Sequence, residues 1–227
     1  MREAGRDVQN EYDYIIVGAG SAGCVVANRL SASGKHSVLL LEAGGADNWI
    51  WFHIPVGYLF AIGNPRADWM FETVAEPRLN GRALAYPRGK VLGGSSAINA
   101  MISMRGQAAD YDHWASLGLP GWSWSDVLPV FRRIEDHFLG DSDHHATGGE
   151  WRVEAPRVTW PILDAVRSAA SDMGVPQVPD FNTGDNEGSS YFHVNQKRGL
   201  RWSAARGFLR PARKRPNLRV ETGCLAD

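Results

Sequence analysis

The chain has 227 residues, 44% of them hydrophobic and 22% charged, with a formal net charge of −1. This composition is typical of a soluble globular protein, and the small charge excludes a global field that would attract nucleic acid or anionic lipid. The stretch 197–219 carries basic residues without an acidic one. Apolar residues separate its arginines, so we interpret it as solvated surface and not as a nucleic-acid site.

The first predicted elements form a βαβ unit. Tyr14 to Val17 is a short apolar run typical of a buried parallel strand, and Ser37 to Leu41 predicts a second. Between them, apolar residues recur at helical spacing from Ala22 to Leu30. A right-handed crossover should make the two strands parallel neighbours. Cys24 falls on the predicted helix, where a buried free thiol is expected.

From Gly44 to Gly94 the pattern weakens, and the many Trp, Pro and Gly residues indicate a surface wrap. Short strands are predicted at 69–74 and 83–86, and a small-residue helix at 95–102. The next predictions are a helix at 111–117, a helix capped by Ser125, a polar loop at 140–149 and a strand at 150–154.

Pro161 suits the first turn of a helix that continues to Met173, and Gly174 suits its end. Ser203 is predicted to cap a short helix, and Leu218 with Val220 indicates a strand. Residues 1–11 are charged and polar, unlike a signal peptide, and no apolar run reaches the length of a membrane span. With two cysteines and no disulfide framework, a cytoplasmic location is expected.

A glycine motif between the first strand and the helix predicts a dinucleotide site. Its residues are Gly18, Ala19, Gly20, Ser21, Ala22 and Gly23. The glycines permit a tight turn, a close approach of backbone to a pyrophosphate, and close packing of helix on strand. Glu42 ends the second strand, where a carboxylate accepts hydrogen bonds from a ribose diol and repels a 2′-phosphate. NAD sites use the same parts, so the motif alone does not identify FAD.

A second motif runs from Arg88 to Met101, with a double glycine and two serines at a predicted helix start. Such a segment lets backbone lie against a planar or anionic ligand. It is equally typical of a tight helix-packing turn, and the residues alone leave both interpretations open.

Together these motifs resemble the glucose–methanol–choline (GMC) oxidoreductase family. The resemblance rests on GAGSAG at 18–23, LEAGG at 41–45 and RGKVLGGSSAIN at 88–99, and it continues through residues 105–106, 110–114, 122–124, 147–149, 201–209 and 216–218. It covers nearly all of 12–227 and is nearest to bacterial choline-dehydrogenase-like and alcohol-dehydrogenase-like members.

The resemblance implies an α/β fold: a Rossmann-like FAD-binding domain with the beginning of an α+β substrate domain. We expect the FAD-binding domain at 1–150 and 200–227, the start of the substrate domain at 151–199, and the C-terminal half outside this chain. The implied cofactor-binding residues are Gly18, Ala19, Gly20, Ser21, Ala22, Gly23, Glu42, Ala43, Val91, Gly94, Ser95, Asn99, Ala100, Met101, Ile102 and Leu225. Some relatives attach FAD through a histidine where this chain has Ile98, so non-covalent FAD is expected.

The implied reaction is oxidation of an alcohol to an aldehyde by hydride transfer to flavin N5, with oxygen, a quinone or another molecule as electron acceptor. The family's catalytic histidine matches nothing here, so no catalytic residue is assigned and little turnover is expected from this chain alone. Association through the truncated surface is a further expectation. Two alternatives stay open: an NAD-dependent Rossmann dehydrogenase, and a non-catalytic flavin-binding remnant.

The histidines carry no predicted site. His144 and His145 lie near acidic residues in the polar loop, which resembles a variable loop of the family and not a metal site. We therefore expect no metal. His36 and His137 are expected at the surface, and His193 lacks a partner within sequence reach.

Overall fold

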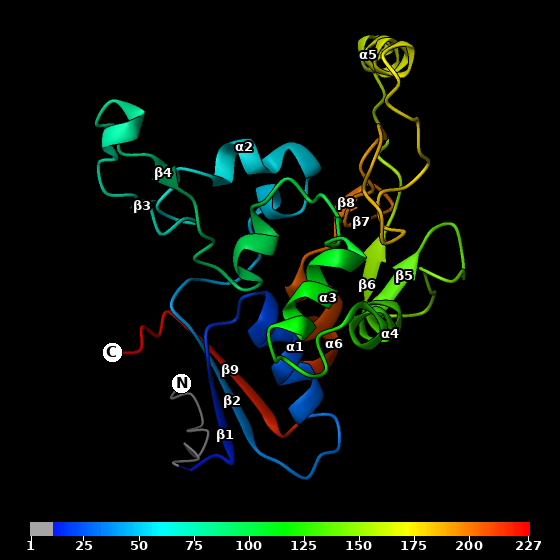
Figure 1. Ribbon diagram of the computed structural model, residues 1–227. Coiled ribbons are helices and arrows are strands. Elements are labelled where there is room, and N and C mark those ends of the chain that lie inside the picture. The colour runs from blue at the N-terminus through cyan, green and yellow to red at the C-terminus, as the bar shows by residue number, and fades with distance from the viewer. Residues whose placement is uncertain (1–10) are drawn as a thin grey trace. The chain divides into compact units, whose positions relative to one another are not determined.

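The computed structural model describes residues 11–227, so the prediction for residues 1–11 lies almost wholly outside the described part (Figure 1). The chain forms two compact units. Within the described residues, the first joins 11–99 to 203–227, and the second comprises 100–202. These boundaries fall at 99/100 and 202/203, whereas the sequence-based domain limits lie at 150/151 and 199/200.

The first unit is built on a parallel sheet with strand order β1-β2-β9 (Figure 1). Its strands are β1 (Tyr14–Val17), β2 (Val38–Glu42) and β9 (Leu218–Thr222). Tyr14 pairs with Val38, and Val38 pairs in turn with Leu218. The predicted parallel βαβ unit and the late strand are therefore confirmed.

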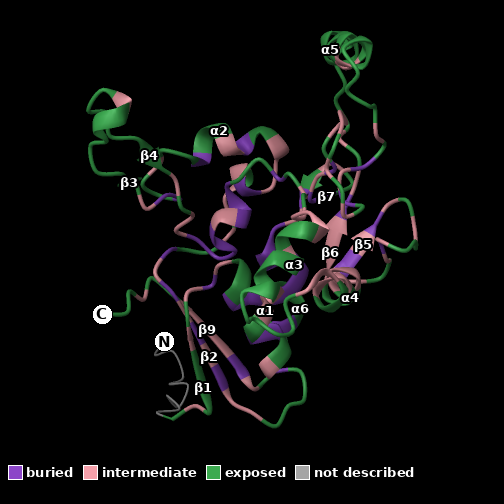
Figure 2. Ribbon diagram, in the orientation of Figure 1, coloured by how far each residue is buried: buried purple, intermediate pink, exposed green. Residues whose placement is uncertain are grey.

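The expectation that the first strand is buried is wrong. Figure 2 shows β2 alternating between buried and half-buried residues, while β1 is largely exposed. Ile15 is 59% exposed and Val17 67% exposed. Within the described residues β1 is the edge of the sheet, whereas β2 has a strand on each side.

Helix α1 (Ser21–Leu30) crosses between β1 and β2 and contacts both strands. Gly23, Cys24 and Ala27 are buried on it, which confirms Cys24 as a buried free thiol. The helix also contacts the segment 205–212, a π-helical turn η5 (Ala205–Leu209) followed by α6 (Arg210–Ala212). The Ser203 hydroxyl accepts from the Arg206 N–H at 3.4 Å, as a helix cap would.

Short elements connect the two motifs of the first unit. They are η1 (Ile50–Phe52), η2 (Pro55–Gly57), α2 (Tyr58–Ala61), β3 (Phe71–Glu72), η3 (Pro77–Leu79), β4 (Ala85–Tyr86) and η4 (Gly94–Ala97). Strands β3 and β4 pair antiparallel, shorter than predicted. The predicted helix at 95–102 is wrong: the double glycine opens a single 3₁₀ turn, and Ile98 already leaves helical geometry.

The second unit begins with two helices in contact, α3 (Ala108–Ser116) and α4 (Trp124–Ile134). Ser123 caps α4, and its N–H donates to the Asp126 carboxylate at 3.1 Å in a capping box. The predicted cap, Ser125, instead lies in the first turn. Asp126 stands three residues after Ser123, the spacing at which an acidic side chain can return a bond to the cap residue.

The rest of the second unit contains β5 (Glu135–His137), β6 (Trp151–Val153), α5 (Pro161–Asp172), β7 (Gln196–Lys197) and β8 (Leu200–Arg201). Strands β5 and β6 are parallel, and β7 and β8 form an antiparallel pair. Helix α5 starts at Pro161 as predicted, but its apolar residues Ile162 and Val166 are 62% and 58% exposed. Among the described residues, no helix combines the length and apolar character needed to cross a membrane.

Candidate functional site

The glycine motif forms the turn from β1 into α1. Gly18 adopts a φ of +90°, and its N–H donates to the Leu41 carbonyl at 2.8 Å, which ties the turn to β2. A Cβ at Gly23 would lie 1.9 Å from the Gly18 carbonyl oxygen, so only glycine allows this packing. Gly20 caps α1 without a side chain, and no acidic residue lies in the first turn. The helix therefore presents free N–H groups and a positive end at this turn.

Glu42 holds the glycine turn in place. Its carboxylate is buried, and it accepts from the Ala19 N–H at 2.7 Å and from the Gly44 N–H at 2.8 Å. The side chain thus has a structural role that the sequence does not reveal. Each carboxylate oxygen has a second lone pair, so these bonds leave room for further donors.

The second motif lies against the first. The Gly93 N–H donates to the Ala19 carbonyl at 2.7 Å, and a Cβ at Gly94 would lie 2.7 Å from the Gly20 Cα. The Ser96 hydroxyl fixes the turn by donating to the Gly93 carbonyl at 2.6 Å. The sequence left open whether the second motif contacts a ligand or forms a tight packing turn. The structure shows tight packing, and it lies between the two glycine motifs.

A cavity of about 220 Å³ opens beside both motifs, at the carboxyl ends of β1 and β2. Its walls include six of the predicted residues: Gly18, Gly20, Glu42, Ala43, Gly94 and Leu225. Cys224, which the resemblance places with Leu225 near the adenine, also lines the cavity, whereas Val17, Leu41, Trp69, Gly89 and Ala226 were not predicted. Gly89 belongs to the second motif itself, but nothing in the sequence marks Trp69, whose ring lies 4.8 Å from the Lys90 ammonium.

The other predicted residues lie outside these walls. Ala19, Gly23 and Val91 are buried in the first unit, where they support the turn. Ser21 and Ala22 are exposed on the first turn of α1, and Ser95 accepts from the Gly89 N–H at 3.1 Å. Asn99 is exposed at the end of the first unit, and Ala100, Met101 and Ile102 begin the second.

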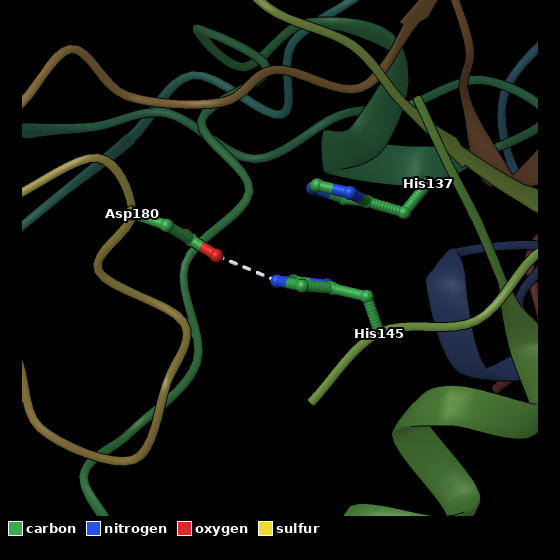
Figure 3. Close-up of side chains that lie close together, drawn as sticks. All are labelled: His137, His145 and Asp180. Atoms are coloured by element: carbon green, nitrogen blue, oxygen red, sulfur yellow. Dashed lines mark hydrogen bonds and ion pairs between the residues drawn. The ribbon is translucent and has the colours of Figure 1, made fainter. Parts of the chain in front are cut away.

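A buried cluster of ionisable side chains lies in the second unit, centred on His145 (Figure 3). His145 Nδ1 is 2.8 Å from the Glu135 carboxylate, and Nε2 is 2.6 Å from the Asp180 carboxylate. Arg105 forms an ion pair of 2.7 Å with the other oxygen of Glu135. The sequence predicts a polar loop here and does not reveal this cluster, whose side chains are 6% to 8% exposed.

The His137 imidazole stacks on that of His145 with ring centroids 3.8 Å apart (Figure 3). His137 is 1% exposed, so the prediction of a surface position is wrong. Its Nε2 lies 3.2 Å from His193 Nδ1, and this contact between residues 56 apart in sequence gives His193 a partner that was not foreseen.

Burial and charge divide these histidines into charged and neutral forms. Burial alone would lower the pKa of His145, but its hydrogen bonds to Asp180 and Glu135 outweigh burial and raise it to about 9. For His137, burial and the neighbouring His145 charge lower the pKa to about 4. Burial also lowers the pKa of His193. The pKa values of Glu135 and Asp180 are lowered despite burial, by their bonds to His145.

His137, His145 and Asp180 bring potential metal-ligand atoms within 4.8 Å of one another. A metal ion lies in the plane of each imidazole that binds it, because the nitrogen lone pair lies in that plane. The two stacked rings are only 14° from parallel, so no point between them lies in both planes. The arrangement favours a proton on His145 over a metal ion shared by the two histidines.

Comparison with known proteins connects the glycine motifs to a family. The family model described as GMC oxidoreductase matches residues 12–227. The oxygen-dependent choline dehydrogenase of Vibrio vulnificus is 44% identical over 222 residues, covering 97% of this chain and 40% of the relative. The chain thus spans about two fifths of the length of that curated relative.

Solved structures give the same result for the fold. Pyridoxine 4-oxidase from Mesorbium loti matches with a TM-score of 0.89 and 36% identity, over 94% of this chain and 42% of its own. An FAD-dependent oxidoreductase from Chaetomium thermophilum matches with a TM-score of 0.85 and 28% identity, over 93% and 38%. The Rossmann-like α/β fold predicted from the sequence is confirmed, and the chain belongs to the GMC oxidoreductase family.

Proposed function

We propose that this chain binds FAD non-covalently and forms the cofactor-binding part of an oxidoreductase acting on the CH–OH group of an alcohol. One observation carries the proposal: a glycine turn at a helix N-terminus lines a cavity that a second glycine motif also lines. This is the arrangement that a dinucleotide pyrophosphate requires. The family relationship and an FAD-dependent neighbour of the same fold support FAD over NAD.

The chain's residues would hold the cofactor from several sides. The turn Gly18–Gly23 would bind the pyrophosphate through backbone N–H groups. Glu42 would accept the ribose hydroxyls with its remaining lone pairs, and Leu225 would lie against the adenine. Val91 and the segment 99–102 are proposed for the flavin end. The buried Ile98 offers no nucleophile for a covalent bond, which supports non-covalent attachment.

Bound FAD supplies a two-electron acceptor for hydride from the alcohol carbon. In this proposal the chain binds and orients that group, and it contributes no catalytic base. The choline dehydrogenase relationship supports a small primary alcohol as substrate, with oxygen, a quinone or another acceptor completing turnover. The cytoplasmic location expected from the sequence stays a proposal as well.

Gly20→Ala tests the FAD site without disturbing the fold. Gly20 has a φ of −72°, which alanine adopts freely, and a Cβ there would meet no protein atom within 4 Å. The methyl group would instead enter the space proposed for the pyrophosphate. Gly45→Ala is the matched control, because its Cβ also meets nothing within 4 Å and the residue does not line the cavity.

The readout is the flavin absorbance of each chain after reconstitution, followed by acid precipitation. We expect the wild type and Gly45→Ala to carry FAD that appears in the supernatant, and Gly20→Ala to lose most of it at unchanged thermal stability. Flavin that stays in the pellet would contradict non-covalent binding. Equal FAD in Gly20→Ala, or uptake of NADH in place of FAD, would contradict the proposed site.

A further inference from the structure

The ring of His145 is held from both sides by carboxylates on distant segments. Glu135 lies on β5 and Asp180 on the loop after α5, and each has a carboxylate oxygen within hydrogen-bond distance of one ring nitrogen. An ionised carboxylate only accepts hydrogen bonds, so both nitrogens must carry a proton and the ring must be an imidazolium. We call Arg105, Glu135, His145 and Asp180 the His145 clamp.

The charges that face this ring come from every neighbouring segment. Glu135 and Asp180 contribute two negative charges, Arg105 one positive charge, and His137 and His193 two rings held neutral by burial. The Arg132 Nε donates to the backbone carbonyl of His145 at 3.3 Å. The four clamp groups are electrically neutral together only while His145 is protonated. Its deprotonation would leave an uncompensated buried negative charge.

The clamp continues through Asn182 to the segment that follows the second motif. The Asn182 N–H donates to Asp180 Oδ1 at 2.8 Å. Its side-chain oxygen accepts from the Arg105 N–H at 2.8 Å, and its amide donates to the Ser103 carbonyl at 3.1 Å. Asn182 thus joins the ion pair, through its backbone N–H, to the backbone of residues 103–105, through its side chain.

The same segment is fixed by further bonds from the cluster. The Ser103 N–H donates to the His193 carbonyl at 2.9 Å, and the Asn195 N–H donates to the Met101 carbonyl at 2.8 Å. Met101 is buried with a φ of +63°, a conformation that a non-glycine residue keeps only when its surroundings impose it. The backbone of 101–105 is therefore held in part by Asn182 and His193, and both of these residues contact Asp180 of the clamp.

We propose that His145 is a positioning residue: its protonated ring holds the backbone of residues 101–105, and loss of that proton shifts the segment. Since 99–102 is assigned to the flavin end of the cofactor, this inference extends the proposed FAD function. The fluorescence of a bound flavin would then depend on the protonation of His145, which the flavin does not contact.

The first test needs no cofactor. In the ¹⁵N-histidine-labelled chain, both ring nitrogens of His145 should be protonated at neutral pH and titrate near pH 9, as its raised pKa requires. The amide resonances of Ser103 and Arg105 should move with the same midpoint. A His145 that carries one proton at neutral pH, or amides that stay fixed across its titration, would overturn the proposal. A zinc-induced shift of the His145 nitrogens would assign the cluster to metal binding instead.

Two variants separate the titration of His145 from its transmission through Asn182 to residues 103–105. His145→Gln removes the titrating group, so the Ser103 and Arg105 amides should no longer respond near pH 9. Asn182→Ala leaves the ion pairs in place and removes the side-chain bonds of Asn182 to Ser103 and Arg105, so His145 should keep its raised pKa while the two amides respond much less. His144→Gln is the control, because the neighbouring side chain lies outside the clamp. Unchanged amide titration in Asn182→Ala would overturn the proposed route.

The FAD-loaded chain gives the final readout. Flavin fluorescence should change with a midpoint near pH 9 in the wild type and His144→Gln, and change much less in Asn182→Ala. A chain that shows coupled amide and His145 titration but takes up no FAD would support the positioning role and refute the FAD site. If the amides respond to pH but the bound flavin does not, only the proposed connection between His145 and the flavin would be refuted.

Discussion

The Cα of Gly20 and the position of a Cβ on Gly94 are only 2.7 Å apart, so the two glycine motifs meet without room for a methyl group. The contact joins residues that are far apart in sequence, in a first unit whose core includes the buried Val91 and Ala97. Gly94 also has a φ of +53°, where a side chain adds backbone strain.

Gly94→Ala should therefore lower the free energy of unfolding by about 2–4 kcal/mol, from overpacking and strain together. Urea denaturation monitored by tryptophan fluorescence measures this difference. Gly45→Ala serves as the comparison and should unfold like the wild type, since its Cβ meets nothing. Equal midpoints for the two variants would show that the motifs do not pack as described.

The stability of the second unit should be greatest near neutral pH. The pKa of His145 is raised in the folded chain to about 9, so its contribution is full below pH 6.5 and is lost as the pH rises through 9. The pKa of His137 is lowered to about 4, so its contribution is present above pH 6.5 and is lost as the pH falls toward 4. Urea unfolding across this range should give a maximum near pH 6.5–7. In His145→Gln the alkaline decline should shrink, whereas an unchanged decline would assign it to other groups.

Ser123→Ala should cost about 1 kcal/mol of stability, because Ser123 caps α4 in a reciprocal box with Asp126. Ser125→Ala changes the same kind of side chain two residues later, inside the first turn, and should cost less than half as much. The comparison uses thermal or urea unfolding of the two single variants. A larger loss in Ser125→Ala would restore the cap predicted from the sequence.

The two cysteines should react very differently with a maleimide. Cys24 is fully buried, and burial raises the pKa of its thiol to about 12, so it should stay unmodified in the folded chain. Cys224 is half-buried in the wall of the cavity and should be labelled. FAD should slow this labelling, as mass spectrometry of the intact chain would record. Cys224→Ser should abolish rapid labelling, and indifference to FAD would count against the adenine position near Leu225.

The sequence predicts those features of the fold that local patterns encode. The glycine turn, α1 and the paired strands follow from periodicity and glycine spacing between Tyr14 and Glu42. Pro161 marks the start of α5 because its fixed φ suits the first turn of a helix. Burial is predicted less well, because the exposure of Ile15 depends on which strand is the sheet edge and not on its own residue type.

The candidate site is predicted only where local sequence motifs encode it. Gly18, Gly20 and Glu42, which the sequence assigns to one cofactor site, line a single cavity, but the bonds from Glu42 to Ala19 and Gly44 follow from the turn's three-dimensional path. The His145 clamp was missed altogether. Asp180 lies 35 residues from His145, and no motif spacing relates a histidine in a polar loop to a carboxylate so far along the chain.

The position of β9 beside β2 has a consequence for synthesis on the ribosome. The sheet of the first unit needs residues 218–222, whereas the second unit is continuous from 100 to 202. At ~5–20 residues per second, β2 emerges roughly 10–40 s before its partner β9. During that interval an apolar strand edge is open to wrong partners, and the whole second unit is synthesised before β9 emerges. Production of this chain should therefore benefit from slower initiation and from chaperones that shield nascent strands.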